Sequence, residues 1–165
     1  IAAMPARRLP PPPAAERTPL ARLSEGQLRN IVGYQLAQAT LATNQVFEIQ
    51  VGQAEQLRRV EFTLLALIDA NPGVTARQLA RALAVTPPNV AVMLDRLDGH
   101  GLVLRERGTA DARMQHLSLT PAGRALVHRA SLALQAGEAA SLSDLSSAER
   151  AMLAELLHKA AQSRR

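Results

Sequence analysis

Cysteine and tryptophan are absent from this chain of 165 residues, and aromatic residues are nearly so, since only Tyr34, Phe47 and Phe62 occur. The lack of cysteine excludes disulfides, thiolate metal sites, iron–sulfur clusters and thiol-based redox sensing. Leucine, valine, isoleucine and alanine must therefore fill most of the core. No apolar run approaches the roughly 18 residues that cross a bilayer, so we expect no transmembrane segment and no membrane partner.

Lysine occurs only once, at Lys159, which leaves 18 arginines among the 19 basic residues. Against 14 acidic residues, the net charge is +5. Arginine binds phosphate groups and guanine in a bidentate manner, so this balance favours a polyanionic partner. Arginine enrichment also follows from a GC-rich genome, and composition alone does not decide between the two explanations.

Residues 1–22 form a Pro/Arg-rich arm without a helical or strand period. Its four consecutive prolines, Pro10–Pro13, favour a polyproline-II conformation. Six prolines among the first 20 residues leave no apolar segment for a secretion signal, so we expect a cytoplasmic location. The chain length fits one domain with this tail, and whether the arm has a function of its own stays open.

A long amphipathic helix is predicted over residues 24–50. Ser24 and Gln27 have the spacing of a capping box, and apolar residues then recur at every third or fourth position. Gly52 is expected to end this helix. A helix of such length in a short chain often has a partner outside its own domain, so we predict that residues 23–52 contribute to dimerisation.

Three shorter helices follow, each with its own start or stop signal. The first covers residues 57–70 and ends at an Asn-Pro-Gly sequence. The second opens at the capping box formed by Thr75 and Gln78. A tight turn joins it to the third, which spans residues 86–99 and starts with a Thr-Pro pair, the pattern of a capped helix with proline at its first position.

Two strands are predicted at Leu102–Arg107 and Met114–Leu119, on either side of a polar loop. Leucines alternate along both segments, as at Leu102 and Leu104 in the first, and these leucines are expected to face the core. The two strands and their loop form a small hairpin.

Two further helices are predicted after the strands, opened by Thr120-Pro121 and by the capping box of Ser146 and Glu149. The order helix, helix, helix, strand, loop, strand is that of a winged helix-turn-helix. The predicted fold is therefore mostly α with a small β-wing. We predict that residues 53–120 form a DNA-binding lobe and that residues 121–165 form C-terminal dimerisation helices.

DNA is the partner that this arrangement favours. The N-terminal turn of helix 86–99 is expected to enter the major groove, where Asn89 suits adenine and Pro88 suits a thymine methyl group. The helix that starts at Thr75 suits backbone phosphates, and the arginines of wing 105–114 suit the minor groove. The predicted DNA-binding residues are Thr75, Arg77, Gln78, Thr86, Pro88, Asn89, Val92, Arg96, Arg105, Arg107, Asp111 and Arg113.

Several of these residues have a simpler explanation. Arg96 could pair with a neighbouring aspartate instead of DNA. Arg113 could be held by Asp111, while Arg77 and Asn89 could simply be solvated. The set as a whole favours DNA more strongly than any single member does.

Three sequence patterns resemble a known family when taken together. They are D-R-L-x-x-x-G-L-V-x-R at 95–105, the D-x-R wing at 111–113 and L-T-P-x-G at 119–123. Over residues 24–160 the chain resembles the MarR (multiple antibiotic resistance regulator) family of bacterial transcription factors. The resemblance implies a homodimer joined by its first and last helices, a pseudo-palindromic DNA operator and, often, release by a small aromatic or anionic ligand.

Two departures from the family pattern limit what the resemblance carries over. The wing reads Asp111-Ala112-Arg113, where many members have a second arginine in the middle, so we expect weaker phosphate contact there. Helix 86–99 begins with Pro-Pro-Asn where serine or threonine is common, so its operator contacts cannot be transferred. The absence of cysteine excludes the peroxide-sensing branch of the family for this chain.

The resemblance also implies a small-molecule effector, since effectors in this family often bind between the dimer helices and the DNA-binding lobe. The predicted effector-binding residues are Tyr34, Arg58, Arg59 and Phe62, which suit an aromatic carboxylate such as a phenolic acid, or its thioester. The alternative is that both aromatics belong to the core and Arg59 is solvated. No cofactor or metal site is predicted, because the four histidines show no close ligand pairing.

The predicted function is a ligand-responsive dimeric repressor. The alternative is a winged-helix module that binds protein and not DNA, which would need an apolar exposed face on helix 86–99. An enzyme is not expected, because the sequence has no G-x-S-x-G, no glycine-rich phosphate loop and no H-E-x-x-H. The sequence does not identify the operator, the regulated genes or the effector, nor does it separate repression from activation.

Overall fold

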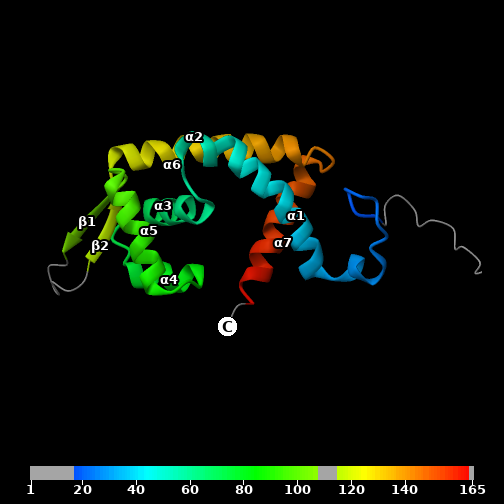
Figure 1. Ribbon diagram of the computed structural model, residues 1–165, viewed down its shortest axis with the longest axis horizontal. Coiled ribbons are helices and arrows are strands. Elements are labelled where there is room, and N and C mark those ends of the chain that lie inside the picture. The colour runs from blue at the N-terminus through cyan, green and yellow to red at the C-terminus, as the bar shows by residue number, and fades with distance from the viewer. Residues whose placement is uncertain (1–16, 108–114, 164–165) are drawn as a thin grey trace, which may run out of the picture. The chain divides into compact units, whose positions relative to one another are not determined.

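The computed structural model describes residues 17–107 and 115–163, which Figure 1 draws in colour. The chain divides into two compact units, residues 1–42 and 43–165. The boundary falls within helix α1 (Val32–Phe47). The predicted wing loop, with Asp111 and Arg113, lies outside the described residues. The mostly helical fold with one small antiparallel sheet confirms the predicted fold class.

The segment before α1 differs from the prediction. Residues Gly26–Asn30 form a short 3₁₀ helix, η2, and α1 begins only at Val32. Ser24 does not cap a helix, because it pairs as an isolated β-bridge with Arg17. Positive φ angles at Ala21 (61°) and Gly26 (52°) turn the chain on either side of Ser24, so the predicted helix start at residue 24 is wrong.

Gly52 does not end the first helix, contrary to the prediction. After α1 the chain continues through a π-helical turn, η3 (Glu48–Gly52), and a last short turn, α2 (Gln53–Glu55). The end comes at Gln56, which adopts a left-handed conformation with φ 51°. Gly52 is buried with helical φ, and a Cβ atom there would lie 2.6 Å from Oε2 of Glu48.

The winged helix-turn-helix forms as predicted. Its helices are α3 (Arg59–Ala70), α4 (Ala76–Leu83) and α5 (Pro87–Gly99), and its strands are β1 (Val103–Arg107) and β2 (Gln115–Leu119). They share one core of aliphatic side chains, to which α3 contributes its whole buried face. The fully buried members include Leu64, Leu65, Ile68, Leu79, Val90, Leu94, Leu97, Val103 and Leu117.

The strand register corrects one part of the predicted pattern. Val103 pairs with Leu119 and Arg105 pairs with Leu117, and the aliphatic members of these pairs are buried. Leu104 is exposed because it lies on the face of the strand opposite Val103 and Arg105, where it pairs with Ser118. Leu102 is buried but precedes the strand, so the alternation within β1 begins at Val103, one residue later than predicted. Arg105 therefore shares the face of the sheet that carries Leu117.

Two helices complete the second unit, α6 (Pro121–Ser141) and α7 (Ser147–Ala161). Both begin at the predicted caps, since Thr120 accepts a hydrogen bond from the Gly123 amide (3.0 Å) and Ser146 forms a capping box with Glu149. These bonds from Ser146 hold the pKa of Glu149 below its ordinary value. Helix α6 packs against η3, α3 and β2, whereas α7 has no buried residue.

Gly123→Ala is expected to lower the free energy of unfolding by about 2 kcal/mol, the usual range for overpacking a core. A Cβ atom at Gly123 would overlap the carbonyl oxygen of Leu102, which belongs to the backbone and cannot rotate away. Gly99→Ala is the matched control, because nothing lies within 4 Å of its Cβ position. Urea denaturation should therefore separate the two variants, and equal stabilities would contradict the predicted overlap.

Candidate nucleic-acid interface and pocket

The first turn of α5 projects from the lobe with its side chains in solvent. Thr86, Pro88 and Asn89 are exposed, and Val92, one turn later, is 69% exposed. The opposite face of α5 is anchored in the core by three fully buried side chains, Val90, Leu94 and Leu97. Proline at the first two helical positions needs no amide donor there, which lets the helix start sharply after the tight turn.

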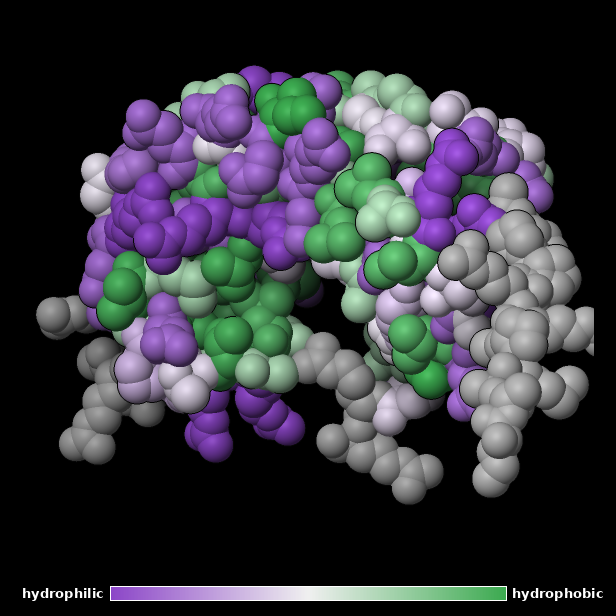
Figure 2. Space-filling model, turned by 45° about the vertical axis from the view of Figure 1, so that its right-hand side comes forward, coloured by the Kyte–Doolittle hydropathy of each residue, from purple (hydrophilic) through white to green (hydrophobic). Residues whose placement is uncertain are grey.

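Helix α4 begins with a complete capping box. The Thr75 hydroxyl accepts from the amide of Gln78 (3.3 Å), and the Gln78 side chain accepts from the amide of Thr75 (2.9 Å). Gln78 is therefore tied to the cap, whereas Arg77 and Arg81 extend into solvent. Hydrophilic side chains project from the lower edge of the lobe, where α4 lies (Figures 1 and 2).

The base of the wing is joined to α5 by charge. Arg105, which is partly buried, pairs with Asp95 (2.6 Å) and with Asp98 (3.5 Å), both on α5. These pairs give Arg105 a structural role between helix and wing, and its contact with DNA stays a prediction. The side chain of Arg107, together with Asp111 and Arg113, lies outside what the structure describes.

Arg96 has partners that the sequence did not indicate. Its guanidinium pairs with Oε1 of Glu61 on α3 (3.0 Å) and donates to the carbonyl of Gln56 (2.8 Å), and neither neighbouring aspartate is among these partners. Glu61 is only 1% exposed and is the one charged side chain that is buried in the described part of the chain. Arg96 is thus directed toward the base of α3, and its contact with DNA stays a prediction.

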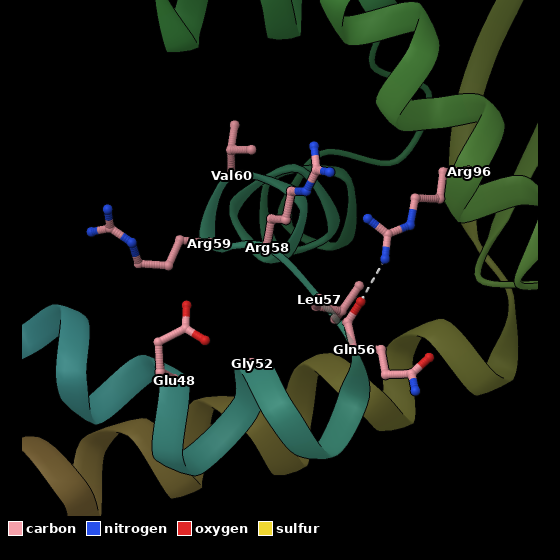
Figure 3. A pocket seen from close by; sticks show the side chains of 8 residues that line it. All are labelled: Glu48, Gly52, Gln56, Leu57, Arg58, Arg59, Val60 and Arg96. Carbon is pink, nitrogen blue, oxygen red and sulfur yellow. Dashed lines mark hydrogen bonds between the residues drawn. The ribbon is translucent and has the colours of Figure 1, made fainter.

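A pocket of about 600 Å³ opens where the hinge between α2 and α3 meets α5 (Figure 3). Figure 3 shows Glu48 rising from η3 toward the segment that carries Arg58 and Arg59, with Arg96 entering from α5. Three arginines and one solvent-facing carboxylate give this pocket a positive balance, which suits an anion. Its lining residues are Glu48, Gly52, Gln56, Leu57, Arg58, Arg59, Val60 and Arg96.

The four predicted effector residues do not form one group. Arg58 and Arg59 line the pocket, and Arg59 also donates to Asn44. Phe62 instead packs against the core, its ring 6.1 Å from that of Phe47. The structure therefore supports the alternative for Phe62, which is that this side chain belongs to the core.

Tyr34 belongs to the other unit of the chain. Its hydroxyl donates a hydrogen bond to Glu25 (3.2 Å). Partial burial, this hydrogen bond and the negative charge of Glu25 together raise the pKa of Tyr34.

Sequence reasoning missed Glu48, Gln56 and Glu61. Glu61 stands three residues after Arg58, the spacing of a capping box, and its carboxylate accepts from the Arg58 amide (2.8 Å). The first residue of that box is arginine instead of serine or threonine, so the usual signature was absent. Nothing in the sequence marks Gln56, because glutamine has no particular preference for the left-handed backbone conformation that it adopts here.

Other kinds of site find no support among residues 17–107 and 115–163. Within these ranges His, Asp and Glu do not gather in groups of three that could hold a metal ion. The helices described there are also too short or too polar to cross a membrane.

Comparison with known proteins identifies what this chain is similar to. The MarR family model matches residues 57–114. The HTH-type transcriptional repressor Rv2887 of Mycobacterium tuberculosis is 31% identical over 99 residues, 60% of this chain and 71% of that protein.

Two solved structures add to this comparison. The transcriptional repressor CouR, bound to a 23-mer DNA duplex, is 34% identical with a TM-score of 0.75, covering 84% of this chain and 98% of CouR. The Mycobacterium tuberculosis MarR family protein Rv2887 in complex with salicylic acid is 27% identical with a TM-score of 0.63, covering 78% of this chain and 94% of that one. These similarities are to transcriptional regulators and not to enzymes, and the chain belongs to the MarR family of transcriptional regulators.

Proposed function

We propose that this protein is a homodimeric repressor that binds a pseudo-palindromic DNA operator and leaves it when a small aromatic anion binds. The exposed first turn of α5, anchored from behind by Val90, Leu94 and Leu97, is the observation that carries the proposal. A helix presented in this way fits the major groove. CouR, similar over nearly its whole length, was solved on DNA.

Each contact with DNA follows from where a side chain lies. Thr86, Pro88, Asn89 and Val92 face solvent on α5 and would meet base edges, with Val92 suited to a thymine methyl group. Arg77 at the start of α4 would meet phosphates, together with the backbone amides near Thr75. The wing, including Arg107, Asp111 and Arg113, would lie along the minor groove. In a symmetric dimer the two α5 helices would then lie about 34 Å apart, one turn of DNA.

Dimerisation is supported by apolar side chains that the chain itself leaves uncovered. On α7, Met152 is 59% and Leu156 is 53% exposed, and Leu153 and Leu157 beside them are exposed too. Leu28, Ile31 and Leu36, before and within α1, are also exposed. Apolar helix faces of this kind usually mark an interface, and a second copy of the chain is the partner that the family architecture favours.

The pocket between the α2–α3 hinge and α5 is the proposed effector site. Arg58, Arg59 and Arg96 suit a carboxylate, and Leu57 and Val60 offer apolar surface to an aromatic ring. Salicylic acid, present in the Rv2887 complex, is therefore a suitable probe. A phenolic acid or its thioester would fit the same chemistry.

Fluorescence anisotropy with the promoter of its own gene and those of neighbouring genes tests the proposal. Specific binding should weaken steeply with salt, since each neutralised phosphate releases counterions. Salicylate should weaken it further, and the neutral analogue salicylamide should not. Weak binding without sequence preference at moderate salt would favour the alternative of a protein-binding module.

Arg77→Ala and Asn89→Ala are expected to affect DNA binding in different ways. Loss of a phosphate contact at Arg77 should weaken binding to all sequences alike and reduce the slope of log Kd against log salt by about one. Loss of base contacts at Asn89 should reduce discrimination at one base step by about 1–3 kcal/mol. Titration against an operator and its single-base variants measures both, and the same effect from both substitutions would contradict these roles.

A further inference from the structure

Arg96 is the side chain by which α5 reaches the pocket, and its present partner is a buried carboxylate. We propose that Arg96 couples the pocket to the DNA-binding surface, because an anion in the pocket competes with Glu61 for its guanidinium. This inference rests on the proposed function of the pocket. It assigns Arg96 and Glu61 a regulatory role in place of a contact with DNA.

Glu61 is fixed from two sides, so it cannot follow Arg96 if that side chain turns away. Oε1 holds Nη1 of Arg96 at 3.0 Å, while Oε2 accepts from the amide of Arg58 at 2.8 Å. The second bond is part of the N-terminal cap of α3. The carboxylate therefore marks a fixed point on α3 against which α5 is positioned.

Arg96 is held less tightly than Glu61 and remains accessible from the pocket. Its side chain is 37% exposed, and two of its five N–H groups serve Glu61 and the carbonyl of Gln56. Figure 3 shows the guanidinium pointing toward Gln56 at the edge of the cavity. An incoming carboxylate can therefore approach it from the side of Arg58 and Arg59.

The competition has a mechanical consequence. If Arg96 turns to the anion while α5 stays in place, Glu61 is left as an unpaired buried charge, which is strongly unfavourable. A shift of α5 avoids this cost, because one guanidinium can then contact both carboxylates. Asn89 stands seven residues before Arg96, about two turns along the same rigid helix, so a shift at Arg96 moves the surface proposed to read DNA.

The wing would move together with α5. Asp95 and Asp98, which flank Arg96 in the sequence, both pair with Arg105 of β1. A displacement of this part of α5 therefore reaches the base of the wing through two ion pairs. One anion in the pocket can thus change both surfaces proposed to touch DNA.

The test separates effector affinity from coupling. For each variant, coupling is the Kd for the operator at saturating salicylate divided by its Kd without salicylate, so every variant is compared with its own baseline. The wild-type protein should show a ratio of about fivefold or more, the lower end of usual allosteric coupling. Arg96→Gln combined with Glu61→Gln keeps a neutral hydrogen-bonding pair in the core and should bring the ratio close to one.

Two single variants complete the set. Arg59→Gln should weaken salicylate binding but leave the ratio at saturation near that of the wild type, because Arg59 lies on α3 and not on α5. Arg129→Gln removes the same charge from α6, at a position outside the lining of the pocket, and should change neither quantity.

Glu61→Gln alone gives a result that a purely structural role would not. With its competitor neutral, Arg96 is freer to bind the anion, so salicylate should bind about fivefold or more tightly, as calorimetry can measure. The coupling role is overturned if Glu61→Gln binds salicylate no more tightly than the wild type. It is also overturned if the double variant keeps the wild-type ratio. Either result leaves the proposed function standing. A wild-type protein that binds DNA but does not respond to salicylate overturns the anion site and this inference together.

Discussion

Replacing Met152 and Leu156 of α7 by glutamate is expected to yield monomers and to weaken operator binding by about 100-fold or more. Both side chains are more than half exposed in the single chain, so the substitutions should not disturb its own core. In a dimer interface, each would place a carboxylate where apolar surface is removed from water, and burying a charge without a partner is strongly unfavourable.

The loss of DNA affinity follows from the loss of the second half-site. A dimer binds its second half-site as an intramolecular event, and such linkage raises affinity by about 10²–10⁴-fold without any new contact. A monomer has only one α5 and one wing to offer. Light scattering measures the oligomeric state, and anisotropy with the full operator measures the affinity.

Ala151→Glu with His158→Glu is the matched control, because helical geometry places these positions opposite the centre of the apolar face of α7, which Met152, Leu153, Leu156 and Leu157 form. The same number of carboxylates is introduced on the same helix. This control should remain dimeric and bind DNA as the wild type does. Monomers from both pairs, or dimers from both, would contradict the assignment of the apolar α7 face to the interface.

The sequence predicts the lobe well because its elements are specified locally. In the pairs Thr75 with Gln78 and Ser146 with Glu149, each side chain accepts a hydrogen bond from the backbone amide of the other residue, and this reciprocal cap marks a helix start in the local sequence. Gly73, with φ 87°, marks a turn in the same local way. The exposed first turn of α5 is likewise predictable from its Thr-Pro start.

Features that depend on contacts between distant residues could not be predicted. Gly52 has the identity of a helix terminator, yet it is buried within a continuing helical segment that packs against α6. Leu104 follows a strand pattern but is exposed, since Val103 and not Leu104 occupies the face of β1 that packs on the core. In both cases the residue type favoured the predicted local structure, but tertiary packing determined the structure that forms.

The same limit applies to the charged residues of the site. Arg96 stands between possible partners at positions 95 and 98, and local reasoning therefore weighed a neighbouring aspartate against DNA. Its actual partner, Glu61, lies 35 residues away, and those aspartates pair with Arg105 instead. Charges pair according to the fold and not according to their distance along the chain.

Arg96→Ala is expected to lower the free energy of unfolding by about 3 kcal/mol, the largest effect of any single substitution proposed for stability. Removing one partner of a buried ion pair usually costs about 3–5 kcal/mol, because the other charge remains buried without compensation. Glu61 is 1% exposed, whereas Arg96 is 37% exposed, so partial solvent screening places the expected value at the lower end.

Arg129→Ala tests whether burial is the cause. Arg129 also bonds to a carboxylate, with both Nε and Nη2 at 2.9 Å from Glu55, but its side chain is 55% exposed. Exposed pairs contribute little, so this variant should lose no more than about 1 kcal/mol. Urea denaturation at one protein concentration compares the two, since the stability of a dimer depends on concentration.

Adding Glu61→Gln to Arg96→Ala should recover part of the lost stability. The second substitution removes the uncompensated charge, while the neutral amide can still accept from the Arg58 amide and so keep the cap of α3. A double variant less stable than the single one would mean that Arg96 acts mainly through packing. Recovery would instead identify the buried carboxylate of Glu61 as the group that requires Arg96.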